Sequence, residues 1–117
     1  MTEIITRFAP SPTGNLHLGS ARTALINFII SQQNLSSKFY LRIEDTDKIR
    51  SKEEYTKNII KSLLWLGLSW DSEPQIQSQR INQHKKIANL LLDKNYAYKC
   101  NCDEEKLEEK RRLIKKK

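Results

Sequence analysis

Residues 7–20, Arg-Phe-Ala-Pro-Ser-Pro-Thr-Gly-Asn-Leu-His-Leu-Gly-Ser, lead from a short apolar strand through a turn rich in proline and glycine into an amphipathic helix. Backbone N–H groups at a helix start have no intrahelical partner, and the helix dipole is positive there. Phosphate oxygens are therefore favoured beside Gly14, His17 and Gly19. Glycine also lets a ligand approach the backbone closely. The stretch predicts an anion site where a strand meets a helix.

The segments on either side of this turn predict a parallel α/β sheet. Ile4–Phe8 and Phe39–Ile43 are β-rich, and a helix that begins near Leu18 separates them. A strand, helix and strand with a connection of this length form a parallel pair joined by a right-handed crossover, as in the amino-terminal half of a doubly wound sheet. Ligands bind such sheets at the carboxyl ends of the strands. Ala9–Gly14 and Glu44–Asp47 both follow a strand, so we expect them to face one crevice.

The rest of the chain predicts further helices and one more strand. Ser51 and Glu54 have the spacing of a capping box, which would start a helix that ends at Gly67. A second helix is expected over about 78–94, a third strand over 96–100, and a helix from residue 103, either solvated or disordered beyond residue 111. The apolar residues expected to point inward from the helix over 78–94 are Ile81, Ile87, Ala88 and Leu91.

Composition narrows the class of protein. Lysine and arginine outnumber aspartate and glutamate by 21 to 14 among 117 residues, a formal charge of +7. This balance favours a polyanionic partner such as RNA, although charge alone leaves the question open. No window approaches the roughly 20 apolar residues of a membrane span, and no export signal is visible, so we expect a soluble, cytoplasmic protein. The two cysteines then indicate thiols or metal ligands rather than a disulfide framework.

Several motifs resemble one enzyme family. The tetrapeptide at residues 17–20 resembles the His-Ile-Gly-His signature of class I aminoacyl-tRNA synthetases, with Ser20 in place of the second histidine. The run over residues 7–14, the Arg-Thr-Ala-Leu at 22–25 and the Leu-Arg-Ile-Glu-Asp-Thr-Asp at 41–47 resemble glutamyl-tRNA synthetases in particular. Those enzymes are several times longer. The resemblance therefore implies a fragment, with residues 1–99 as the first half of the nucleotide-binding catalytic domain. Residues 100–117 would begin an inserted region that binds the tRNA acceptor end.

The resemblance also implies a reaction and a set of site residues. The parent enzyme, expected to be a monomer, would use ATP and Mg²⁺ to activate L-glutamate and transfer it to the 3′ end of tRNA(Glu). His17 and Gly19 would be catalytic, and the residues against ATP would be Thr13, Gly14, His17 and Gly19. Those against glutamate would be Arg7, Ala9, Ser11 and Glu44, with Arg7 gripping the side-chain carboxylate and Ser11 and Glu44 receiving the ammonium group.

Two groups of residues keep more than one interpretation. Asp45, Thr46 and Asp47 resemble residues near the tRNA 3′ end, but a role in holding their loop is equally open. Arg22, Arg42 and Arg50 are either partners of these acids or RNA contacts.

The cysteines and the missing motifs set limits on what this chain would do alone. Cys100 and Cys102 are either free thiols or half of a zinc site, because a closed tetrahedral site needs four ligands; Zn²⁺ would bind only in the longer parent. The family's Lys-Met-Ser-Lys-Ser-like loop does not occur in these residues, so the fragment alone is expected to be inactive. Two alternatives stay open: a truncated paralogue that activates glutamate to modify a tRNA base, and a non-catalytic fragment that binds nucleotide or tRNA.

Overall fold

The computed structural model describes residues 3–115, which form two compact units, the first ending at Ile81 and the second beginning at Asn82. The elements of the first unit are β1 (Ile5–Phe8), α1 (Leu18–Ser31), β2 (Lys38–Ile43), α2 (Glu53–Trp65), β3 (Gln75–Ile76) and the 3₁₀ helix η1 (Gln77–Arg80). Helix α3 (Ile81–Asp93) begins at the boundary, and α4 (Glu104–Lys115) follows in the second unit. Among the described residues, no helix is long and apolar enough to cross a membrane.

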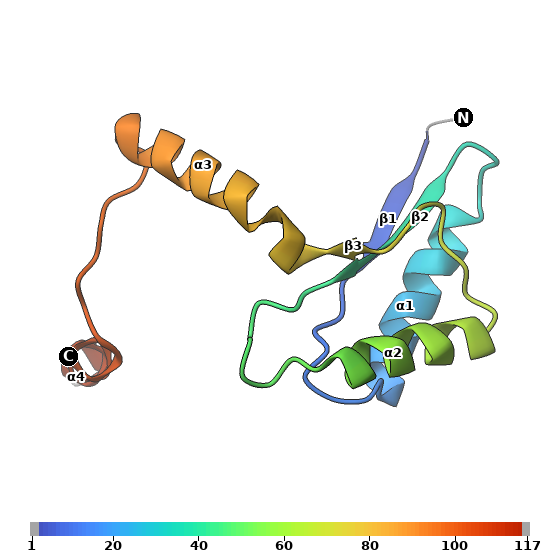
Figure 1. Ribbon diagram of the computed structural model, residues 1–117, viewed down its shortest axis with the longest axis horizontal. Coiled ribbons are helices and arrows are strands. Elements are labelled where there is room, and N and C mark those ends of the chain that lie inside the picture. Colours follow the sequence, from blue (N-terminus) through green and yellow to red (C-terminus); the bar gives the residue numbers. More distant parts are fainter. Residues whose placement is uncertain (1–2, 116–117) are drawn as a thin grey trace. The chain divides into compact units, whose positions relative to one another are not determined.

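The first unit is built on a sheet of three parallel strands in the order β1-β2-β3 (Figure 1). Arg7 lies opposite Tyr40 in the β1–β2 pair, and Arg42 lies opposite Gln75 in the β2–β3 pair. The predicted parallel α/β arrangement is confirmed.

The predicted third strand is wrong. Residues 96–100 form no strand, and the third strand is the two-residue Gln75–Ile76. A strand of two residues is too short to show a period of two in the sequence. Residues 96–100 include residue types that are common in strands. However, β propensity reflects packing against neighbouring strands, and this segment pairs with no strand in the described structure. All three strands of the described chain belong to the first unit.

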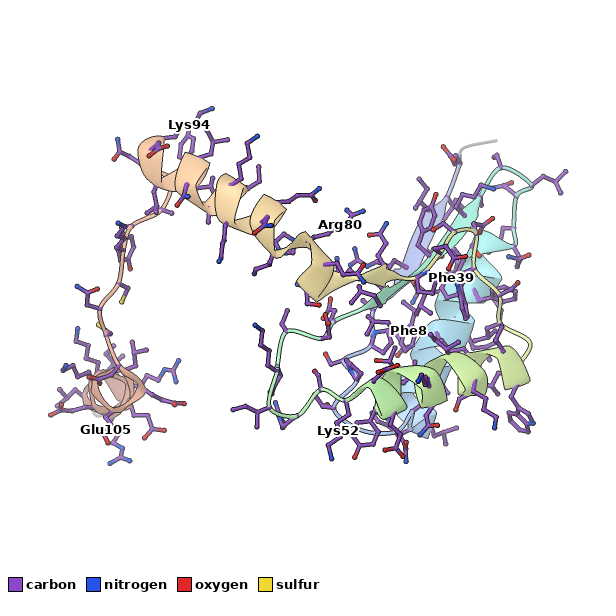
Figure 2. The ribbon with its side chains drawn as sticks, in the orientation of Figure 1. Phe8, Phe39, Lys52, Arg80, Lys94 and Glu105 are labelled. Atoms are coloured by element: carbon purple, nitrogen blue, oxygen red, sulfur yellow. The ribbon has the colours of Figure 1, made fainter. Side chains whose placement is uncertain are left out.

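One face of the sheet packs against both helices of the first unit. Side chains alternate between the two faces of a strand, so Phe39, Leu41 and Ile43 share one face of β2. Figure 2 labels Phe8 and Phe39 among the side chains of this unit. Helix α1 contributes Ala24 to the core, and helix α2 contributes Ile59 and Leu63. The complete set of buried hydrophobic residues is Phe8, Ala24, Phe39, Leu41, Ile43, Ile59, Leu63 and Leu68.

Helix α2 starts two residues after Ser51, so the predicted capping box is wrong. Lys52 is the N-cap and makes no side-chain capping bond, while Ser51 Oγ is buried without a partner in the described chain. The Lys52 N–H donates to the Pro12 carbonyl at 3.1 Å, and the Ser51 N–H donates to the Asp47 carbonyl at 2.8 Å. The bond to Pro12 is tertiary and the bond to Asp47 is local, and together they fix the backbone before the helix. The other end agrees with expectation, because Gly67 follows the helix with a φ of +76°.

The inward face predicted for α3 is not buried in the structure. Ile81, Ile87 and Leu91 are all exposed, and no residue of α3 is buried. An amphipathic pattern shows that a helix has an apolar face, but it carries no information on what covers that face. Beyond Arg111, where a solvated helix or disorder was expected, helix α4 continues to Lys115, and residues 116 and 117 lie outside the described residues.

The carboxylate of Asp71 completes the hydrogen bonding of β2. The Phe39 N–H donates to Asp71 Oδ2 at 2.8 Å, and the Asp71 N–H donates to the Phe39 carbonyl at 2.9 Å. Lys38 Nζ lies 3.1 Å from Asp71 Oδ1. The bond from the Phe39 amide, followed by that from Lys38, holds the pKa of Asp71 below its ordinary value of 3.8.

Replacing Asp71 by alanine should destabilise the 117-residue chain by about 1–3 kcal/mol, because the Phe39 N–H loses a charged acceptor. A lowered pKa means that the ionised carboxylate stabilises the folded state above about pH 4, and that this stability is lost as pH falls through the folded pKa. Urea unfolding at pH 6 and pH 3 measures both effects. Glu53→Ala is the control, since its pair with Lys57 is exposed to solvent; equal stability of the two variants would contradict the prediction.

Candidate functional site

The loop after β1 and the start of α1 enclose a hollow of about 500 Å³. Six of the residues predicted to contact ATP or glutamate line it, together with Ser20, Thr23 and the core residue Ile59. The structure thus brings these predicted residues together: Ala9, Ser11, Thr13, Gly14, His17 and Gly19.

His17 is the N-cap of α1. Its Nδ1 accepts a hydrogen bond from the Ser20 N–H at 3.3 Å, and its carbonyl accepts one from the Ala21 N–H at 2.9 Å. Ser20 Oγ lies 2.9 Å from Nε2. In a neutral ring whose Nδ1 accepts, Nε2 carries the hydrogen, so Ser20 orients the one donor of the ring. The N–H groups of Leu18 and Gly19 stay at the helix start without intrahelical partners.

The two glycines of the hollow differ in what surrounds them. A Cβ at Gly19 would lie 3.1 Å from Cε1 and 3.2 Å from Nδ1 of His17, so the imidazole would have to shift by a few tenths of an ångström to admit a side chain there. A Cβ at Gly14 would meet nothing within 4 Å. Gly19 therefore leaves room for the His17 ring, whereas Gly14 leaves open space beside the backbone.

The loops that follow β1 and β2 are joined directly, as expected for the carboxyl ends of neighbouring parallel strands. The Glu44 N–H donates to the Pro10 carbonyl at 2.9 Å. The Glu44 carboxylate forms an ion pair with Arg42, its neighbour two residues back on β2. Arg42 thus pairs with Glu44 rather than with Asp45 or Asp47, whereas Arg50 is the arginine that pairs with Asp47.

Arg7 lies in a separate hollow of about 480 Å³, together with Tyr40, Arg42 and Gln75. The alternation of side chains along β1 explains this separation, because Phe8 points into the core and Arg7 points to the opposite face. Within residues 3–115 the guanidinium of Arg7 makes no hydrogen bond or ion pair, and its side chain is exposed. The site therefore consists of two hollows, one lined by the turn and helix start and one by the sheet face.

The three residues predicted to lie near tRNA, Asp45, Thr46 and Asp47, have different surroundings. Asp45 accepts hydrogen bonds from the N–H and hydroxyl of Ser78. Asp47 accepts from the N–H groups of Ile49 and Arg50 and from Arg50 Nε. The hydrogen bond from the Arg50 side chain is the main reason that the pKa of Asp47 lies below its ordinary value. Thr46 is exposed. Asp45 and Asp47 thus hold their loop through these hydrogen bonds.

The two cysteines lie close together in the second unit. The Cys102 N–H donates to Cys100 Sγ at 3.5 Å, which lowers the pKa of the Cys100 thiol, and Lys110 Nζ lies 4.0 Å from Cys102 Sγ. Across the described part of the chain, no group of three or more histidine, cysteine, aspartate or glutamate residues is placed to hold a metal ion. The pair alone supplies two of the four ligands that a closed zinc site requires.

Some residues of the site region were not predicted. Ser78, the partner of Asp45, is 33 residues away in the chain, and no local pattern indicates such a contact. Tyr40 and Gln75 line the hollow with Arg7. The alternation along β2 predicts that Tyr40 and Arg42 share a face, and this signal was available once β2 had been assigned.

Comparisons with known proteins identify the family of the chain. Residues 3–117 match the family described as tRNA synthetases class I (E and Q), catalytic domain. A glutamate–tRNA ligase of Pelagibacter ubique is 50% identical over 117 residues, which cover all of this chain and 25% of that protein. A glutamate–tRNA ligase of Prochlorococcus marinus strain MIT 9211 is 57% identical over 104 residues, covering 89% of this chain and 22% of that protein.

A solved structure gives the same result for the fold. The crystal structure of a glutamate–tRNA synthetase from Elizabethkingia anophelis has a TM-score of 0.83 at 34% identity, and the match covers 97% of this chain and 24% of that one. The chain thus spans about a quarter of the length of these relatives. Because the family match covers nearly the whole chain, the chain belongs to the catalytic-domain family of class I tRNA synthetases for glutamate and glutamine.

Proposed function

We propose that these residues form part of a glutamate–tRNA ligase, which uses ATP to activate L-glutamate and transfers it to the 3′ end of tRNA(Glu). The observation that carries the proposal is the hollow at the start of α1, lined by His17, Gly19 and Gly14. It occurs in a chain half identical to a glutamate–tRNA ligase. We place the enzyme in the cytoplasm, where tRNA is charged.

The residues of this hollow fit a nucleotide phosphate. The free N–H groups at the start of a 14-residue helix favour an anion. The open space beside Gly14 admits a ligand to the backbone. His17 Nε2–H would turn from Ser20 to a phosphate oxygen. ATP supplies the phosphoryl group that makes the glutamate carboxylate reactive, and Mg²⁺ would enter on its phosphates, as this ion commonly does.

The second hollow fits the amino acid. The exposed guanidinium of Arg7 has all its donors available in the described structure, and its planar fork matches a carboxylate. Glu44 would receive the ammonium group, with Ala9 and Ser11 in the hollow at the start of α1. This arrangement favours glutamate over glutamine, because a neutral amide would leave a charged donor unpaired.

The function of the remaining predicted residues follows from position. We place residues 1–99 in the first half of the nucleotide-binding domain and residues 100–117 at the start of the acceptor-binding region. Asp45, Thr46 and Asp47 then border the tRNA 3′ end. Cys100 and Cys102 would hold Zn²⁺ only with two further ligands from elsewhere in the parent.

The test is a chimera in which residues 1–117 replace the matching quarter of the Pelagibacter ubique ligase. We expect the chimera to charge tRNA(Glu) with glutamate and to bind a non-reactive glutamyl-adenylate mimic more tightly than its glutaminyl counterpart in a calorimetric titration. The unaltered ligase is the positive control, and thermal melting establishes that the chimera folds. A chimera that melts cooperatively yet neither charges tRNA nor binds the mimic would contradict the proposal and favour a non-catalytic fragment.

A further inference from the structure

The ion pair between Arg42 and Glu44 joins a residue of the Arg7 hollow to the loop after β2, and Glu44 itself is not among the residues that line either hollow. Arg42 lines the hollow that contains Arg7. Glu44 is tied through its backbone N–H to the carbonyl of Pro10, which lines the hollow at the start of α1. We propose that Arg42 is a positioning residue that holds the Glu44 carboxylate ready for the ammonium group of the amino acid. This inference rests on the proposed function.

The geometry of the pair leaves part of the carboxylate available. Arg42 Nη2 contacts Glu44 Oε1, and Oε2 has no partner within residues 3–115. Residues two apart on an extended chain point to the same side, so the contact needs no distortion of the backbone. Arg42 therefore fixes one oxygen of the carboxylate and leaves the other to accept a hydrogen bond. A glutamate side chain held in this way has less rotational freedom to lose when a ligand binds.

Arg42 also carries an unsatisfied group. Its Nε is buried and has no hydrogen-bond partner in the described structure. A buried donor without an acceptor is unfavourable, and native proteins contain few of them. Arg42 lines the same hollow as Arg7. We expect such an unpaired donor where a guanidinium serves a ligand site and not the stability of the fold alone.

A second ion pair on the same strand shows what a structural pair looks like here. Lys38 lies on the same face of β2, and its partner Asp71 also accepts the Phe39 N–H. The Glu44 carboxylate accepts from no backbone N–H of the described chain. Loss of Arg42 would thus leave the backbone hydrogen bonds of the sheet intact and would free only the Glu44 side chain.

The test measures steady-state kinetics of the chimera with Arg42→Gln, Arg42→Lys and Glu44→Gln. Arg42→Gln should raise KM for glutamate about tenfold and leave KM for ATP within about twofold, because the ATP contacts are elsewhere. Arg42→Lys should restore part of the loss. Arg42→Gln should add little in a Glu44→Gln background, since both act through one carboxylate. Lys38→Gln is the matched control and should leave both KM values unchanged.

The outcomes separate this inference from the proposed function. An active chimera whose KM for glutamate does not change in Arg42→Gln contradicts only the role of Arg42. Equal losses for glutamate and ATP, together with a lower melting temperature, would make Arg42 a structural residue and also contradict it. If the chimera that keeps both Arg42 and Glu44 folds but charges no tRNA, that result contradicts the proposed function and, with it, the inference.

Discussion

Replacing Arg7 by alanine in the chimera is expected to lower kcat/KM for glutamate by about 10²- to 10³-fold, the loss typical of removing one partner of a charged pair. The guanidinium is the group placed to meet the side-chain carboxylate of glutamate in the hollow on the sheet face. Steady-state charging of tRNA(Glu) measures the effect. The preference for glutamate over glutamine should fall as well, because the alanine variant no longer leaves a charged donor unpaired against the amide.

Two features make this prediction specific. The Arg7 side chain is exposed and unpaired in the described residues, so the melting temperature should not change. Arg7→Lys keeps the charge but not the planar fork, and it should recover only part of the activity. An alanine variant with the kcat/KM of the parent would remove Arg7 from the amino-acid site.

Replacing His17 by asparagine is expected to reduce kcat by about 10²- to 10³-fold, as for the loss of one pre-organised donor at a transition state. Asparagine is a good N-cap, so it replaces the bond from the Ser20 N–H that the imidazole accepts in the structure. Folding stability should therefore stay the same. Single-turnover charging by the chimera measures the chemical step.

His17→Ala separates the two roles of this residue. It should lose the same activity and also destabilise the chain by about 1 kcal/mol, because no side chain then caps α1. Urea unfolding of the 117-residue chain measures this difference between the two variants. If the asparagine variant kept nearly full activity, His17 would be a cap and nothing more.

The sequence predicted the first two strands and the helix between them better than the rest of the chain. Long, strongly patterned segments such as β2 and α1 were assigned correctly, because local periodicity carries that information. The start of α2 was not, because the Lys52 N–H bonds to the distant Pro12 carbonyl, and such a tertiary bond overrides a local capping pattern. The two-residue β3 and the uncovered face of α3 depend on neighbours, which no local window contains.

The same contrast applies to the site. The turn over residues 9–19 is continuous in sequence, and the structure brings its predicted residues into one hollow. Arg7 was expected in the same crevice, but the alternation along β1 sends it to the other face, beside Tyr40 and Arg42. The contact between Asp45 and Ser78 joins distant segments. Chemistry carried by one segment was thus predictable, and chemistry assembled across strands was less so.

The bonds from the Glu44 N–H to the Pro10 carbonyl and from the Lys52 N–H to the Pro12 carbonyl have a consequence for dynamics. They fasten the loop after β1 to the loop after β2 and to the start of α2. Neither loop can open while the other stays in place without breaking one of these bonds. Hydrogen exchange at the Glu44 and Lys52 amides should therefore proceed at similar rates, through one shared opening. Any gate to the hollows that moves faster must lie outside these two loops.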